Sequence, residues 1–333
     1  MKDRSLRLIV ICLLGLLPIA MYVHLMSGQI ELSYSSYWKA IFDFNNKDTY
    51  QVLIREFRIP RMMMALVAGA GLSLAGMLMQ TLFKNPLAGP YVLGINSGAS
   101  LLIAVSMMTG IQLFQSNFGL IGTALIGAMG AGFLMMFVAQ RLKSQISLLL
   151  VGLMFGSFTA ALVSMIESKA GAESLKSFTM WSMGSLQQVT FEQLPIILTL
   201  FILSIASVFL LVKPLNVLVL GEKSASMLGI HIQRTRFLIL GITALLAGLI
   251  TAFCGPIAFV GMAIPNLTRM LFRTSNHAAL IWGNVLIGGL FLLGIDSITL
   301  FFLYSTMISL LAKGLRCDLI IISCKCLIII IPF

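Results

Sequence analysis

Residues that could do chemistry are few in this sequence, and they lie far apart. Asp296 is the only acid with long apolar stretches on both sides, and the three His residues are distant from one another. The sequence contains no G-x-x-x-x-G-K-[ST] phosphate loop, G-x-S-x-G nucleophile motif or H-E-x-x-H zinc motif. Cys324 and Cys326 are too close together for a C-x-x-C site and have no His nearby. These absences argue against an enzyme, a metal site and a bound cofactor.

The composition predicts an all-α protein in which a polytopic bundle of helices crosses a membrane. The chain is 59% hydrophobic and 10% charged, with a mean hydropathy of +1.02, whereas soluble domains carry about a quarter charged residues. The apolar runs have helical length and lack the short alternating strands of a barrel. The net charge of +11 comes from scattered Lys and Arg residues with no basic stripe, which argues against nucleic acid and favours positive-inside topology.

The apolar runs predict about ten spans of roughly 20 residues each. They lie at 8–26, 62–82, 92–110, 118–139, 146–166, 193–212, 237–253, 257–270 and 279–295, and a final segment reaches towards Lys313 and Arg316. We predict that Asp296 closes the ninth span, and that residues 27–57 form an external segment with a short amphipathic helix near 36–44. The distribution of Lys and Arg between alternate loops places both termini in the cytoplasm of a multi-pass inner-membrane protein.

Two stretches rich in Gly, Pro and amides are predicted to pack tightly and to line a pathway. Small residues between 69 and 76 allow neighbouring backbones to approach closely, and a polar break at 84–86 separates this helix from one that opens at 94–98. A second break follows at Gly255, and broken backbone in a membrane is tolerated only against protein or a water-filled cavity. The candidate residues are Gly76, Gln80, Asn85, Pro86, Gly94, Gly98, Gly255, Pro256, Gly261, Pro265, Asn266 and Arg269.

Three further features have two interpretations each. The polar segment 213–236 is cytoplasmic by span parity. Within it, 220–236 reads as two short helices with Gly breakers and a small apolar face of Ala225, Met227, Leu228 and Ile230. It is either a docking element for a partner or a solvated linker. Arg58 and Arg61 flank Pro60 at the outer mouth of the second span, where they either snorkel or dock a partner. Asp296 is either a functional intramembrane acid or a helix end near water.

Several of these motifs resemble the FecCD family of ABC-transporter permeases, which import iron–siderophores, haem and cobalamin. The resemblance is carried by R-x-P-R at 58–61, by G-P-I-x-F-[VI]-G at 255–261, by P-x-x-x-R at 265–269 and by a cytoplasmic run of five residues. The residues of that run are Gly221, Glu222, Ala225, Leu228 and Gly229. The resemblance implies a type II ABC importer permease with one transmembrane domain over residues 1–333.

The resemblance also implies the partners and their sites. Two copies of the chain would enclose the pathway within the lipid, with two ATPase subunits inside that carry the ATP and Mg. The run at 221–229 would contact the ATPase, and Arg58 and Arg61 would meet acidic residues of an external substrate-binding protein. An iron–siderophore complex is the leading substrate, and cobalamin or haem is the alternative.

The chain departs from the family pattern at two places. Asn266 stands where the family usually has His, and Asn cannot titrate, which puts a proton role there in doubt. Residues 315–333 are rich in Ile and Cys and lack the family's final motifs, so this tail is a natural variant or, as we favour, the product of a frameshift. A different class of protein, a self-sufficient secondary transporter, would need several intramembrane acids, and only Asp296 is available.

Overall fold

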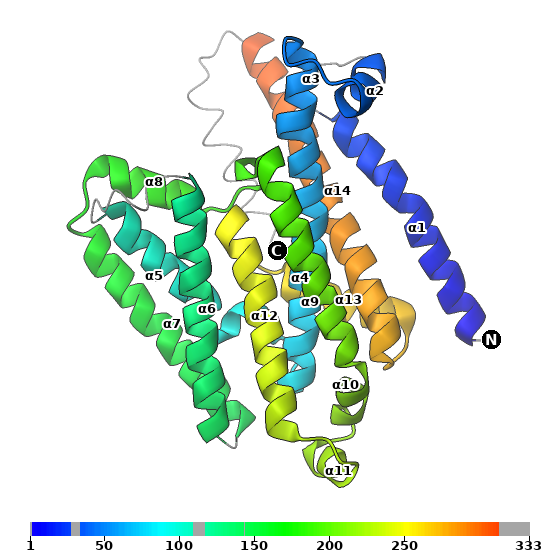
Figure 1. The fold of residues 1–333 in the computed structure, drawn as a ribbon, viewed down its shortest axis with the longest axis vertical. Coiled ribbons are helices and arrows are strands. Elements are labelled where there is room, and N and C mark those ends of the chain that lie inside the picture. Colours follow the sequence, from blue (N-terminus) through cyan, green and yellow to red (C-terminus); the bar gives the residue numbers. More distant parts are fainter. Residues whose placement is uncertain (1, 28–33, 109–116, 143, 313–333) are drawn as a thin grey trace.

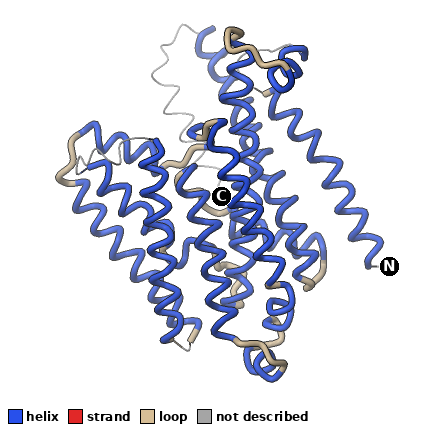
Figure 2. Tube along the Cα trace, viewed as in Figure 1, coloured by secondary structure: helices blue, strands red, loops and turns tan. Residues whose placement is uncertain are grey.

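The computed structural model describes residues 2–27, 34–108, 117–142 and 144–312, and within these ranges every regular element is helical (Figure 2). Seven helical stretches in the described part of the chain are long and apolar enough to cross a membrane. The predicted polytopic helical bundle is therefore confirmed. The helices are α1 (Lys2–Met26), α2 (Tyr34–Phe42), α3 (Thr49–Leu53), α4 (Ile59–Phe83), α5 (Ile95–Met108), α6 (Asn117–Arg141), α7 (Gln145–Glu167), α8 (Ala172–Ser182), α9 (Leu194–Leu210), α10 (Val212–Leu218), α11 (Glu222–Met227), α12 (Ile232–Cys254), α13 (Val260–Phe272) and α14 (His277–Ala312).

Helix α4 lies at the centre of the bundle (Figure 1). Nearly all of its residues are buried, and it packs against α12, α13 and α14. Helices α5, α6 and α7 form a second group beside α12, whereas α1 lies at the opposite edge and contacts mainly α14. The predicted small-residue helix is thus the core of the protein, and the other elements are arranged around it.

The second span is longer than predicted, because α3, a π-helical turn at Ile54–Arg58 and α4 form one continuous helical stretch over Thr49–Phe83. Pro60 cannot donate a backbone hydrogen bond, and its ring crowds the carbonyl four residues earlier. The wider π turn accommodates this, with the Ile59 N–H donating to the Ile54 carbonyl. The Arg58 and Arg61 side chains therefore project from within a helix and not from its mouth.

The prediction that Asp296 closes the ninth span is wrong. Helix α14 continues through this position from His277 to Ala312. The residues that follow Asp296 include no early Gly or Pro to stop a helix, and the carboxylate is neutralised by side chains of other helices. A separate tenth span is not seen up to residue 312. The tail 315–333 and the side of the membrane on which it lies fall outside the described residues.

Two of the predicted spans are short helices. Helix α13 has 13 residues and α5 has 14, which at 1.5 Å per residue is about 20 Å, less than the roughly 30 Å of a bilayer core. Phe259 with positive φ precedes α13, so the chain enters this helix through a break after Gly255. The predicted interruption near 255–256 is confirmed, and α13 is supported by α4 and α14.

Candidate functional site

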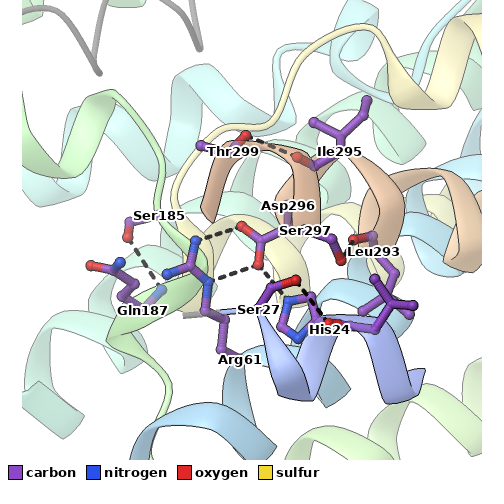
Figure 3. Close-up of polar contacts among 11 residues, drawn as sticks. His24, Ser27, Arg61, Ser185, Gln187, Leu293, Ile295, Asp296, Ser297 and Thr299 are labelled. Atoms are coloured by element: carbon purple, nitrogen blue, oxygen red, sulfur yellow. Dashed lines mark hydrogen bonds and ion pairs between the residues drawn. The ribbon is translucent and has the colours of Figure 1, made fainter. Parts of the chain in front are cut away.

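A buried ion cluster joins three helices: the C-terminal end of α1, the N-terminal end of α4 and the middle of α14 (Figure 3). The Arg61 guanidinium donates to both carboxylate oxygens of Asp296, at 2.7 and 2.6 Å. The His24 imidazole Nε2 lies 2.8 Å from the same carboxylate. Asp296 and His24 are 7% and 2% exposed. Asp296 is therefore not a solvated helix end but the shared partner of two side chains that approach it from different helices.

Arg58 is engaged one turn before this cluster. Its guanidinium donates to the Leu25 carbonyl, at 2.7 Å, and to the Tyr37 hydroxyl. Burial raises the pKa of Tyr37, and the nearby Arg58 only partly offsets this, so the hydroxyl stays protonated. The Tyr37 hydroxyl in turn donates a hydrogen bond to the Leu25 carbonyl, at 2.7 Å. Within this chain, the two Arg residues that are predicted to dock a partner thus connect α4 and the turn before it to α1, α2 and α14.

The backbones of α4 and its neighbours are in direct contact at the predicted small residues. A Cβ atom added to Gly76 would lie 1.5 Å from the carbonyl oxygen of Gly261, and one added to Gly69 would lie 2.1 Å from that of Gly288. Such approaches are possible only without side chains. Gly76 and Gly261 therefore join α4 to α13, and Gly69 joins α4 to α14.

Amide groups connect the C-terminal end of α4 to α13. The Gln80 Nε2 group donates to the carbonyls of Pro86 and Met262, at 2.8 and 2.9 Å. The Asn266 Nδ2 group donates to the same two carbonyls, at 2.8 and 3.0 Å. Each carbonyl has two lone pairs and accepts both bonds. Arg269 completes the group by donating to the Gln80 Oε1 atom.

This geometry gives Asn266 a role that His could not fill in the same way. An amide carries two N–H groups on one nitrogen, whereas a His ring carries them on atoms that point in different directions. Asn266 therefore holds the 84–86 break against α13 through donors alone, and this arrangement requires no proton transfer.

Asn266→Asp should destabilise the protein although the side chains have nearly the same shape. A carboxylate has no N–H to donate and would face two carbonyl oxygens, at a cost of about 2 kcal/mol or more. Asn276→Asp is the matched control, because the Asn276 Oδ1 atom accepts the Ala278 N–H at the start of α14 and Asp accepts equally well. Thermal unfolding of both purified variants checks this, and equal midpoints would contradict it.

The remaining pathway candidates occupy turns and close contacts. Gly94 and Gly255 have positive φ angles of 72° and 71°, and a Cβ on Gly98 would lie 2.5 Å from the Gly127 carbonyl oxygen. Asn85 caps its own turn by accepting the Leu87 N–H. Pro256 and Pro265 lie in the break before α13 and inside α13. These residues form turns beside α4, α5 and α13 or a close contact between α5 and α6, and their lining of a pathway stays a prediction.

The run between Gly221 and Gly229, two Gly residues of positive φ, forms the single short helix α11. The prediction of a second short helix before residue 237 is wrong, because residues from Ile232 onward are the first turns of the long helix α12. Glu222 forms an ion pair with the buried Arg236 of α12. Ala225 is fully buried, so it does not belong to the exposed apolar face expected of it. Met227 and Leu228 belong to the predicted apolar face and do lie at the surface, where they are 85% and 63% exposed. Helix α11 lies at one extreme end of the molecule (Figure 1).

Sequence reasoning missed the polar residues that act as cross-links. The Ser73 hydroxyl donates to Asn284 Oδ1 at 2.6 Å, which connects α4 to α14. His24 on α1 is a partner of Asp296 on α14. The available signal was an isolated polar residue within an apolar run, since buried polar groups need hydrogen-bonding partners. Among the described residues, no group of three or more side chains is arranged to hold a metal ion.

The sequence and structure are similar to those of known transport proteins. Residues 16–312 match the FecCD transport family. The molybdate import system permease MolB of Haemophilus influenzae is 32% identical over 252 residues, which cover 74% of this chain and 73% of the relative. The ferric enterobactin permease FepG of Escherichia coli is 29% identical over 299 residues, which cover 88% of each chain.

A solved structure of a transporter is also similar to this chain. It represents an inward-facing conformation of a transporter assigned to the metal-chelate type of ABC transporter, with a TM-score of 0.78 and 28% identity. The similarity covers 92% of this chain and 99% of the solved chain.

Proposed function

The chain belongs to the FecCD transport family and is a permease of a binding-protein-dependent ABC importer, and on this premise we propose that it carries ferric siderophore complexes across the membrane. The observation that supports this substrate is the similarity to a ferric enterobactin permease over 88% of both chains. As a permease of this family the chain is a transport subunit and not an enzyme. Among the described residues Asp296 is the only buried carboxylate, and it is ion-paired with Arg61 and hydrogen-bonded with His24, which does not favour a self-sufficient secondary transporter.

We propose that α11 is the contact for the ATPase subunit. Gly221 and Gly229 break the helices on either side, and the ion pair of Glu222 with Arg236 fastens α11 to α12. Met227 and Leu228 then present exposed apolar side chains to a groove on the partner. The ATPase binds ATP and Mg and supplies the energy, while a second copy of this chain completes the pathway in an inner membrane with both termini in the cytoplasm.

We further propose that the binding protein docks at the outer end around Arg58 and Arg61. Arg58 and Arg61 are residues of intermediate burial, and the Arg61 side chain keeps 14% of its surface exposed, which leaves each some surface at which to meet an acidic group outside. Charge pairing of this kind favours the encounter rate and the orientation of the partner more than the affinity.

Uptake by cells that lack their own permeases tests this function. Cells that express this chain with its ATPase and binding protein should take up labelled ferric siderophore, and not labelled haem, cobalamin or molybdate. Leu228→Glu should reduce uptake and co-purification of the ATPase by about tenfold, because it places a charge in an apolar contact. Ser224→Glu, an exposed position on the same helix, is the control and should have little effect.

The outcomes separate the substrate from the mechanism. Uptake of haem, cobalamin or molybdate alone would replace the proposed substrate but keep the importer. Equal uptake by the Leu228→Glu variant and the unmodified chain would contradict the role of α11.

A further inference from the structure

The segment that precedes α11 is joined to the core of the bundle by a second polar link. Asn216 lies on α10, the helix directly before Gly221, and its Oδ1 atom accepts the backbone N–H of His277 at 2.8 Å. The same oxygen lies 2.8 Å from the Nδ1 atom of the His277 ring. On the other side of the ring, Nε2 lies 3.1 Å from the hydroxyl oxygen of Thr81 on α4. One His side chain thus connects α10, α14 and α4.

The hydrogen-bonding pattern shows that the ring nitrogen Nδ1 of His277 carries a proton. The backbone N–H can only donate, so the Asn216 atom that faces His277 must be the oxygen. The ring nitrogen Nδ1 therefore carries the proton and donates to the same oxygen. In the neutral ring Nε2 is then an acceptor, and the Thr81 hydroxyl shares its single proton between Nε2 and the Met77 carbonyl, which lies at 2.8 Å. His277 is 2% exposed, so water does not replace these bonds easily.

The two helices that receive this link, α4 and α14, are joined to each other at several points along their length. Helices α4 and α14 touch backbone to backbone at Gly69 and Gly288, and Ser73 bonds to Asn284 between them. Near the N-terminal end of α4, Arg61 forms an ion pair with Asp296 of α14. Thr81 and Arg61 are separated along α4 by about 30 Å at 1.5 Å per residue, which is the thickness of the membrane core. A displacement of α10 at the inner end can therefore be transmitted to the outer end.

We propose that Asn216 and His277 are positioning residues that carry the movement of the ATPase contact into the α4–α14 pair. The inference rests on the proposed role of α11. The Glu222–Arg236 pair leads from α11 to α12, whereas the Asn216–His277 link leads from α10 to the helices that hold the outer cluster. Loss of the Asn216–His277 link should leave binding of the ATPase subunit intact and uncouple ATP hydrolysis from transport.

The test compares transport with ATP hydrolysis in the complete complex reconstituted in vesicles. Asn216→Leu removes the acceptor and should lower the substrate transported per ATP by about tenfold, the size expected for a lost buried hydrogen bond, while ATPase binding is unchanged. Asn216→Asp keeps an acceptor and should stay near the unmodified ratio. Asn276→Ala removes a cap of the same helix without touching α10 and should also keep the ratio.

The controls make each outcome decisive. An unchanged ratio for Asn216→Leu overturns the inference, as does an equal loss for Asn276→Ala, which would assign the effect to the start of α14. If Asn216→Leu does not accumulate in the membrane, Thr81→Val takes its place, since it leaves the α10 contact intact, and it should lower the ratio in the same direction. Failure of the unmodified complex to transport would instead contradict the proposed function.

Discussion

Gly76→Ala should nearly abolish folded protein. The added Cβ would lie 1.5 Å from the Gly261 carbonyl oxygen and 2.5 Å from its carbonyl carbon, so α4 and α13 must separate by roughly 2 Å to reach ordinary contact. Both clashing atoms belong to the backbone, which cannot rotate away as a side chain can. That separation would also stretch the bond from Gln80 to the Met262 carbonyl. We expect at least about a tenfold loss of folded protein, because overpacking and broken hydrogen bonds act together.

The measurement is the amount of monodisperse protein after detergent extraction and gel filtration. Gly130→Ala is the matched control: Gly130 lies within α6, and a Cβ there meets nothing within 4 Å. This variant should accumulate at least as well as the unmodified chain, since Ala favours a helix more than Gly. Equal yields of the two variants would show that α4 and α13 are not in backbone contact.

The parts of the fold that could be predicted are those encoded locally. Apolar runs of membrane length marked the long helices, and the Gly residues at 221, 229 and 255 marked turns that need positive φ. The stretch of small residues before Gln80 was identified correctly as a packed helix, because close packing leaves a compositional trace. The family resemblance, carried by the same motifs, was also confirmed.

The errors arose where distant residues decide the local structure. The prediction that the ninth span closes at Asp296 is wrong, because a carboxylate with partners on other helices can lie within a continuous helix. Its partners Arg61 and His24 lie 235 and 272 residues away, and no local pattern reveals them. Ala225 was assigned to an exposed face for a similar reason, since only the packing of α11 decides which of its apolar residues are covered.

Arg61→Leu and Asp296→Leu should each destabilise the protein by about 3–5 kcal/mol, because each leaves a buried charge without its main partner. The double variant should recover most of the loss, since two apolar side chains replace a pair whose desolvation was costly. A double-mutant cycle of unfolding free energies in detergent measures the coupling. Additive losses, with no recovery in the double variant, would show that the two side chains do not interact in the folded protein.

The double variant also separates the two roles of Arg61. It should be folded but lack the Arg61 charge, so its affinity for the binding protein reports docking without the confounding loss of structure. If Arg61 docks the partner, the double variant binds more weakly than the unmodified chain, and Arg58→Glu weakens binding further. If binding by the double variant is unchanged, then Arg61 serves only to hold α4 against α14, and the docking proposal rests on Arg58 alone.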